Sequence, residues 1–122
     1  MANSVGYHES EDKLRPETMD NHRALTSMQE ELEAADWYDQ RVDATSDPDL
    51  KEILAHNRDE EKEHASMTLE WIRRHDPALD RHLRTYLFTT EPVTEVEAEA
   101  AAAGEGAVAP GSLGIGSLKG RE

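Results

Sequence analysis

The feature that most constrains this chain is a long block without glycine. Six of the seven glycines lie in the last 19 residues, and none lies between Glu17 and Thr90. The block is rich in Glu, Ala, Leu, Arg and Met, whose side chains lose little rotamer freedom in a helix. It shows neither the alternation typical of a β-strand nor an internal repeat. The sequence therefore predicts an all-α fold.

Two Asp-Pro pairs divide this block into helices. Asp47-Pro48 and Asp76-Pro77 each place a good N-cap before a proline at the first helical position, where its missing N–H costs nothing. The predicted helices run from about Glu17 to Asp43, from about Pro48 to Arg74 and from about Pro77 to Leu87. Because the connection at residues 44–47 is short, we expect the two long helices to form an antiparallel hairpin.

A chain of 122 residues allows one small folded domain. The expected segments are a flexible N-terminus (1–16), the helical domain (17–90), a linker rich in Ala, Glu and Gly (91–111) and a short C-terminal motif (112–122). Within the linker, Glu95–Ala103 has helix-forming composition but no apolar stripe. It fits a solvated helical spacer and a disordered segment equally well.

Charge and composition exclude several classes of function. The chain has 27 Asp and Glu against 13 Lys and Arg, a net charge of −14, which disfavours nucleic acid or an anionic membrane surface as a partner and favours cations. Without cysteine there is no disulfide, thiolate metal site or cysteine nucleophile. No signal peptide or run of ~18 apolar residues is present, so we expect a soluble cytoplasmic protein. The low apolar content favours self-association.

Polar side chains interrupt the apolar seam expected between the long helices. In the first helix, Glu31 lies beside a stripe of Leu25, Met28, Leu32, Ala35 and Val42. In the second helix, the expected seam is Leu50, Leu54, Asn57, Glu61, His64, Thr68 and Trp71. Glu61 and His64 are three residues apart and therefore adjacent on one helix face. A carboxylate in such surroundings is costly unless it is protonated, paired or bound to a metal.

Glu-x-x-His is a ligand pattern of ferritin-like di-iron bundles, in which two helices each supply a Glu and two others each supply a Glu-x-x-His. Carboxylates with one imidazole suit iron or manganese and, less distinctively, zinc. This chain carries half of that set, and a two-fold homodimer would complete it. However, a lone Glu-x-x-His is also common among solvated surface residues, so the spacing alone leaves that interpretation open.

Two further groups lie near these residues. The first is Glu30, Glu33 and Trp37 at i, i+3 and i+7, and the second is His56, Glu60 and Glu63 at i, i+4 and i+7. Either could collect cations, but the spacing by itself favours ordinary surface charge for both groups. Tyr38 fits a hydrogen-bonding role near a ligand and simple core packing equally well.

Four strings within residues 23–90 closely resemble the encapsulated ferritins. They are 30–41 (EELEAADWYDQR), 56–65 (HNRDEEKEHA), 68–74 (TLEWIRR) and 83–89 (LRTYLFT). The resemblance implies a two-helix protomer whose homodimer forms a four-helix ferroxidase bundle, with dimers joined into an annular decamer. It further implies oxidation of Fe(II) by dioxygen at the dimer interface, inside an encapsulin nanocompartment in the cytoplasm.

The resemblance also implies roles for individual residues. By matching position, the di-iron ligands (Fe2+/Fe3+) would be Glu31, Glu61 and His64 from two chains, with Glu61 bridging the irons and Tyr38 completing the catalytic set. The metal uptake site would be Glu30, Glu33 and Trp37, and the peripheral metal site His56, Glu60 and Glu63. Accessory sites would accept Ca2+, Mn2+ or Zn2+.

The C-terminal segment 112–120 (SLGIGSLKG) resembles an encapsulin cargo-loading peptide. Its apolar residues Leu113, Ile115 and Leu118 would anchor the chain to the shell. Two other functions remain compatible with the sequence. One is a non-catalytic divalent-metal-binding protein, and the other is a structural helical adaptor.

Overall fold

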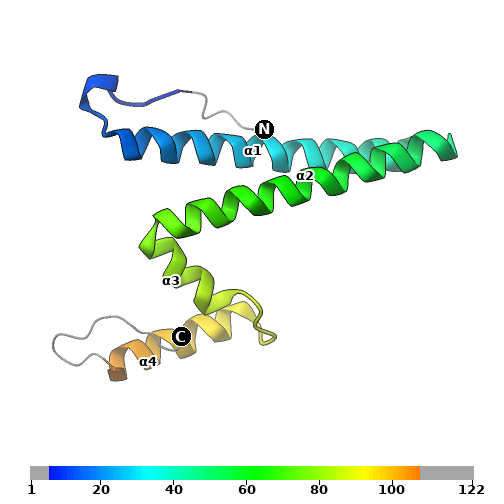
Figure 1. Ribbon diagram of the computed structural model, residues 1–122. Coiled ribbons are helices and arrows are strands. Elements are labelled where there is room, and N and C mark those ends of the chain that lie inside the picture. The colour runs from blue at the N-terminus through cyan, green and yellow to red at the C-terminus, as the bar shows by residue number, and fades with distance from the viewer. Residues whose placement is uncertain (1–5, 108–122) are drawn as a thin grey trace. The chain divides into compact units, whose positions relative to one another are not determined.

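The computed structural model describes residues 6–107, with side chains described for residues 6–104. Its elements are the 3-10 helix η1 (Glu11–Lys13) and the helices α1 (Pro16–Ala44), α2 (Pro48–His75), α3 (Pro77–Tyr86) and α4 (Val93–Ala107) (Figure 1). No strand occurs among the described residues, and the expected all-α class is confirmed. The predicted cargo-loading segment, 112–122, lies outside the described residues.

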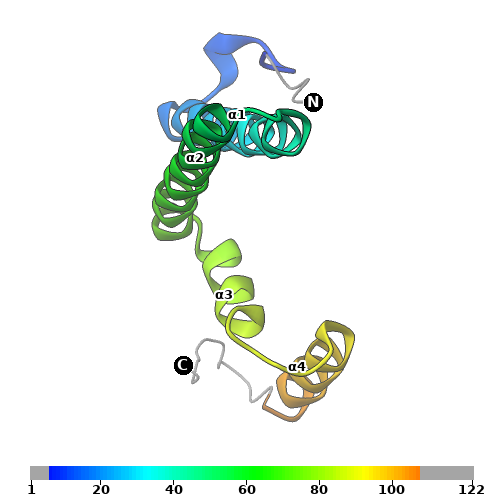
Figure 2. The ribbon, with the colours of Figure 1, turned by 90° about the vertical axis from the view of Figure 1, so that its right-hand side faces the viewer.

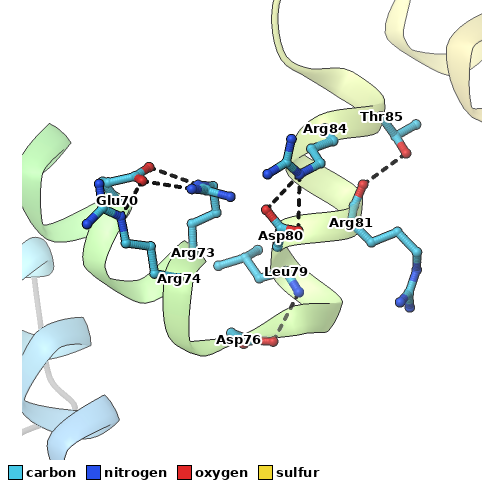
Figure 3. Close-up of polar contacts among 9 residues, drawn as sticks. All are labelled: Glu70, Arg73, Arg74, Asp76, Leu79, Asp80, Arg81, Arg84 and Thr85. Atoms are coloured by element: carbon cyan, nitrogen blue, oxygen red, sulfur yellow. Dashed lines mark hydrogen bonds and ion pairs between the residues drawn. The ribbon is translucent and has the colours of Figure 1, made fainter. Parts of the chain in front are cut away.

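The Asp-Pro pairs begin helices as predicted. Asp47 Oδ1 accepts hydrogen bonds from the backbone N–H groups of Asp49 (2.9 Å) and Leu50 (3.2 Å) at the start of α2. At the start of α3, Asp76 Oδ1 accepts one from the Leu79 N–H at 3.0 Å (Figure 3). These bonds satisfy N–H groups that have no partner within the first turn of a helix. The N-caps therefore set where the second and third helices start.

The chain divides into two compact units, one up to His75 and one from Asp76 onward. In the first unit α1 and α2 lie side by side and antiparallel (Figures 1 and 2). Three polar contacts set their register, and they pair Glu31 with Thr68, Asp39 with Arg58, and the Val42 carbonyl with Lys51. Before α1, the ring of Tyr7 lies against His22, with centroids 5.0 Å apart.

The seam between α1 and α2 is rotated from the one expected. On α1 it is formed by Ala24, Met28, Glu31, Ala35, Tyr38 and Val42, and on α2 by Leu54, Arg58, Glu61, Ala65, Thr68 and Ile72. Glu31 therefore lies within the seam, whereas Leu32 is 53% exposed. Ala35 and Ala65 are both buried in this seam, where small side chains let two helices approach closely, and Ile72 is buried near its end. Leu50 and Trp71, expected in this seam, are exposed.

In the second unit α3 packs against α4, and Val96 is buried there. The segment Glu95–Ala103, for which the sequence favoured neither a helix nor disorder, is helical within α4. Phe88, which follows α3, is fully exposed and has a left-handed backbone conformation, with φ of 65°. Among the described residues, no helix combines the length and the apolar character needed to cross a membrane.

Candidate metal centre

Glu61 and His64 form a close pair on α2. His64 Nδ1 lies 3.7 Å from Glu61 Oε1, and the two side chains are 42% and 27% exposed, respectively. Glu61 belongs to the seam with α1, and His64 lies at its edge, closer to solvent. The Glu-x-x-His spacing thus brings one carboxylate and one imidazole together at the border of the hairpin.

Glu31 reaches the same region from α1. Its Oε1 accepts a hydrogen bond from the Thr68 hydroxyl at 3.1 Å, across the helix–helix seam. The Thr68 hydroxyl oxygen is also 3.1 Å from the backbone carbonyl of His64, one turn earlier on α2. Glu31 therefore faces the turn of α2 that carries His64, and both Glu31 and Thr68 are partly buried.

The part of one protomer that the structure describes does not bring a full set of metal ligands together. Among the residues that the structure describes, no three His, Asp or Glu side chains converge as metal ligands would. The expected di-iron site takes its ligands from two chains, so one protomer would carry only part of it. The assignment of Glu31, Glu61 and His64 as ligands stays a prediction.

Glu60 connects the predicted peripheral site with His64. Its Oε2 lies 3.9 Å from His56 Nε2, and its Oε1 lies 3.8 Å from His64 Nε2. The three side chains are exposed or partly exposed on one face of α2, at spacings of four residues. Glu63, the third member of the predicted peripheral group, is exposed and lines a shallow groove on α2 together with Met67 and Trp71.

The residues of the predicted uptake site lie on α1. Glu30 and Trp37 are exposed, and Glu33 is partly buried. Trp37 lines a shallow hollow with Gln40, Arg41 and Ala44. Tyr38 lies in the seam, and the guanidinium of Arg41 is 5.3 Å from the centre of its ring, within cation–π range.

One face of α2 carries exposed apolar residues on both sides of His64. We call it the outer stripe, and it consists of Leu50, Ile53, Asn57, Glu60, His64, Met67 and Trp71. These positions follow one another at spacings of three and four, which places them on one helix face. Its apolar members are 36% to 60% exposed. Sequence reasoning missed Ile53 and Met67, although the same heptad spacing could have identified them.

Two networks of arginine and carboxylate side chains shift pKa values on the long helices. At the C-terminal end of α2, hydrogen bonds from Arg73 (2.8 Å) and Arg74 (2.7 Å) lower the pKa of Glu70 to about 2 (Figure 3). Arg58 lies 3.0 Å from both Asp59 and Asp39, and these two carboxylates raise its pKa. Hydrogen bonding to Arg58 in turn lowers the pKa of Asp59.

Comparison with known proteins identifies the family. The model of the EncFtn-like family matches residues 6–90, which is more than half of the chain. The protein belongs to the EncFtn-like family. The resemblance to encapsulated ferritins inferred from the sequence is thereby confirmed.

Three relatives and one solved structure show how far the likeness of this EncFtn-like protein extends. It is 61% identical over 123 residues to the encapsulated ferritin-like protein of Rhodospirillum rubrum, covering 93% of this chain and 87% of the relative. It is 51% identical to a ferritin-like protein of Thermotoga maritima (92% and 96% covered) and 37% identical to the encapsulin nanocompartment cargo protein EncC of Myxococcus xanthus (76% and 79% covered). The crystal structure of protein ne0167 from Nitrosomonas europaea matches with a TM-score of 0.70 and 62% identity, over 72% of this chain and 97% of that one.

Proposed function

We propose that this protein is a ferroxidase that oxidises Fe(II) to Fe(III) with dioxygen at a di-iron site shared by two copies of the chain. The supporting observation is that Glu31 and Glu61 both lie in a helix–helix seam, where Glu61 Oε1 is 3.7 Å from the imidazole of His64. Carboxylates in such a seam are costly without a compensating charge. A pair of bound cations supplies that charge.

A second copy of the chain would complete the site. The outer stripe exposes Leu50, Ile53, Met67 and Trp71 on either side of a polar centre that includes His64. Pairing this stripe across a two-fold axis would bury the apolar ends and bring two sets of ligands together. The four long helices of two protomers would then form the ferritin-like bundle, and further dimers would join into the expected annular decamer.

In this proposal Fe(II) is the substrate. Two Fe(II) ions each give up one electron, and dioxygen accepts both. The carboxylates of Glu31 and Glu61 hold the ions and stabilise the ferric state, which prefers anionic oxygen ligands. His64 binds as a neutral imidazole and limits the total negative charge. The net charge of −14 raises the local concentration of cations around the protein.

We further propose that the protein works inside an encapsulin shell. The names of two relatives describe an encapsulated protein and an encapsulin cargo protein. Segment 112–120, with Leu113, Ile115 and Leu118, would dock on the shell wall. The open hairpin encloses no mineral chamber of its own, so the Fe(III) produced would be stored in the space inside the shell.

Mixing Fe(II) with the purified protein in air tests the activity. We expect a rapid rise in ferric absorbance, which Glu61→Gln slows by at least about tenfold, because removal of a metal ligand costs at least as much as loss of its supporting hydrogen bonds. Glu52→Gln is the matched control, since Glu52 is an exposed glutamate on the same helix. Equal rates in all three proteins would contradict the proposal.

Anaerobic loading separates catalysis from simple metal binding. The protein is first titrated with Fe(II) without oxygen and then exposed to air under excess Fe(II). A ferroxidase turns over repeatedly, whereas a metal-buffering protein oxidises Fe(II) no faster than buffer does. A structural adaptor would bind no Fe(II) and would dimerise equally well when Glu31, Glu61 and His64 are replaced.

A further inference from the structure

We infer that Thr68 is a positioning residue that holds the Glu31 carboxylate in place for the metal. This inference rests on the proposed function, because it assigns a role to a neighbour of a proposed ligand. The Thr68 hydroxyl donates to Glu31 Oε1 at 3.1 Å and connects the two long helices at this point. Thr68 itself would not touch the metal.

Glu31 depends on Thr68 because of where it lies. Both residues are partly buried in the α1–α2 seam. Within residues 6–104, Thr68 is the one side chain that donates a hydrogen bond to the Glu31 carboxylate. A partly desolvated carboxylate needs such a donor. Without it, the long and rotatable glutamate side chain is free to leave the orientation in which it faces α2.

The same hydroxyl also lies 3.1 Å from the backbone carbonyl of His64. In helices, serine and threonine hydroxyls commonly donate a hydrogen bond to the backbone carbonyl one turn earlier. The hydroxyls of Ser66 and Thr85 donate only such a bond, with oxygen–oxygen distances of 2.8 and 3.1 Å. The Thr85 contact is drawn in Figure 3. What distinguishes Thr68 is the second acceptor, since an ionised carboxylate attracts the single hydroxyl proton more strongly than a carbonyl does.

The hydrogen bond from Thr68 orients the Glu31 carboxylate for metal binding. With Oε1 held by Thr68, the carboxylate is oriented before the metal arrives, and less side-chain freedom is lost on binding. The Thr68 hydroxyl also connects Glu31, the proposed ligand on α1, with the turn of α2 that carries His64. Hydrogen bonds of this kind to metal ligands commonly change metal affinity by about 10- to 100-fold.

Anaerobic titration with Co(II), followed by visible absorbance, tests the inference without relying on oxidation activity. Subtracting the Glu31→Gln titration isolates the signal that depends on Glu31. We expect Thr68→Val, which removes the hydroxyl but keeps the shape, to weaken the Glu31-dependent affinity by roughly tenfold or more. Thr68→Ser, which keeps a hydroxyl, should restore most of it.

Controls separate positioning from loss of structure. Ser66→Ala removes a hydroxyl bonded to the carbonyl one turn earlier on the same helix and should leave Co(II) affinity unchanged. If Thr68→Val does not fold, as judged by circular dichroism, Thr68→Ala replaces it, because alanine is the best helix former. Unchanged affinity in the folded variant without the hydroxyl, or a Thr68→Ser variant as weak as Thr68→Val, overturns the inference.

The design also distinguishes failure of this inference from failure of the proposed function. If wild type and Glu31→Gln give the same titration, Glu31 is not a metal ligand. In that case both the role of Thr68 and the proposed function are wrong. If they differ but Thr68→Val matches wild type, only the role of Thr68 is wrong.

Discussion

At the scale of single residues, two alanines determine how closely the long helices approach. Ala35 on α1 and Ala65 on α2 are both buried, and the Glu31–Thr68 contact places them at nearly the same level of the hairpin. Leu32, the neighbour of Glu31 on α1, is 53% exposed and lies outside this contact. The close approach lets Thr68 reach Glu31 with a direct hydrogen bond.

Enlarging one of these alanines should disturb the seam. We expect Ala65→Leu to lower the free energy of unfolding by about 1–3 kcal/mol, because additional methylene groups have no space in a close-packed interface. Urea denaturation followed by circular dichroism measures the change. Ala44→Leu, at an exposed position on α1, is the matched control and should change stability little. Equal stabilities of the two variants would contradict this account of the seam.

At the scale of elements, α2 presents different residues on two faces. One face packs on α1 through Glu61, Ala65 and Thr68, and the outer stripe remains exposed. The last turn of the helix contains Arg73 and Arg74, whose positive charges suit the negative end of the helix dipole. Trp71 stacks on His75 with ring centroids 3.9 Å apart. Glu70 forms ion pairs with Arg73 and Arg74 at the same end of the helix.

The ion pairs of Glu70 predict how the free energy of unfolding depends on pH. Arg73 and Arg74 hold the pKa of Glu70 at about 2, below its ordinary value of 4.5. A lowered folded-state pKa stabilises the fold above pH 4.5, and this stabilisation is lost as the pH falls towards 2. Glu70→Gln should therefore be less stable than wild type at neutral pH, and the difference should shrink over that range.

Urea denaturation at a series of pH values measures this difference. The matched control is Glu52→Gln, which removes an exposed glutamate earlier in the same helix. A stability difference for Glu70→Gln that is independent of pH, or that equals the difference for Glu52→Gln, would contradict the assignment.

At the scale of the whole molecule, the hairpin exposes several large apolar side chains to solvent. Ile53 and Met67 are 57% and 60% exposed, and both belong to the outer stripe, which also contains His64. A net charge of −14 opposes association between copies of the chain. Burial of the apolar stripe, together with bound cations at its polar centre, would offset that repulsion. Dimerisation and metal binding are therefore expected to favour each other.

Placing a charge in the stripe should separate the protomers. If the outer stripe forms the proposed dimer interface, we expect Ile53→Lys to weaken dimerisation by at least tenfold, on the order of 1.4 kcal/mol or more, because a lysine would replace an apolar contact there. Sedimentation equilibrium measures the dissociation constant. Glu52→Lys introduces the same side chain at the neighbouring position, outside the stripe, as control. A dimer equally stable in both variants would place the interface elsewhere.

The sequence alone determined the helices, their ends and the residue types capable of binding metal. Helix formation depends on local propensity and capping, so the glycine-free block and the caps at Asp47 and Asp76 were sufficient to predict α1, α2 and α3 to within one residue at each end. The Glu-x-x-His spacing likewise brings Glu61 next to His64 in any regular helix.

Only the tertiary structure decided which face of each helix is buried. A heptad pattern with polar residues in its middle can be drawn along more than one face, and the face predicted from the sequence is not the one that is buried. The observed register instead brings Ala35 and Ala65 close together, places Glu31 in the seam opposite Thr68 and leaves Leu50 and Trp71 in solvent. This choice depends on how two particular surfaces fit each other, a property of the pair of helices that neither helix carries by itself.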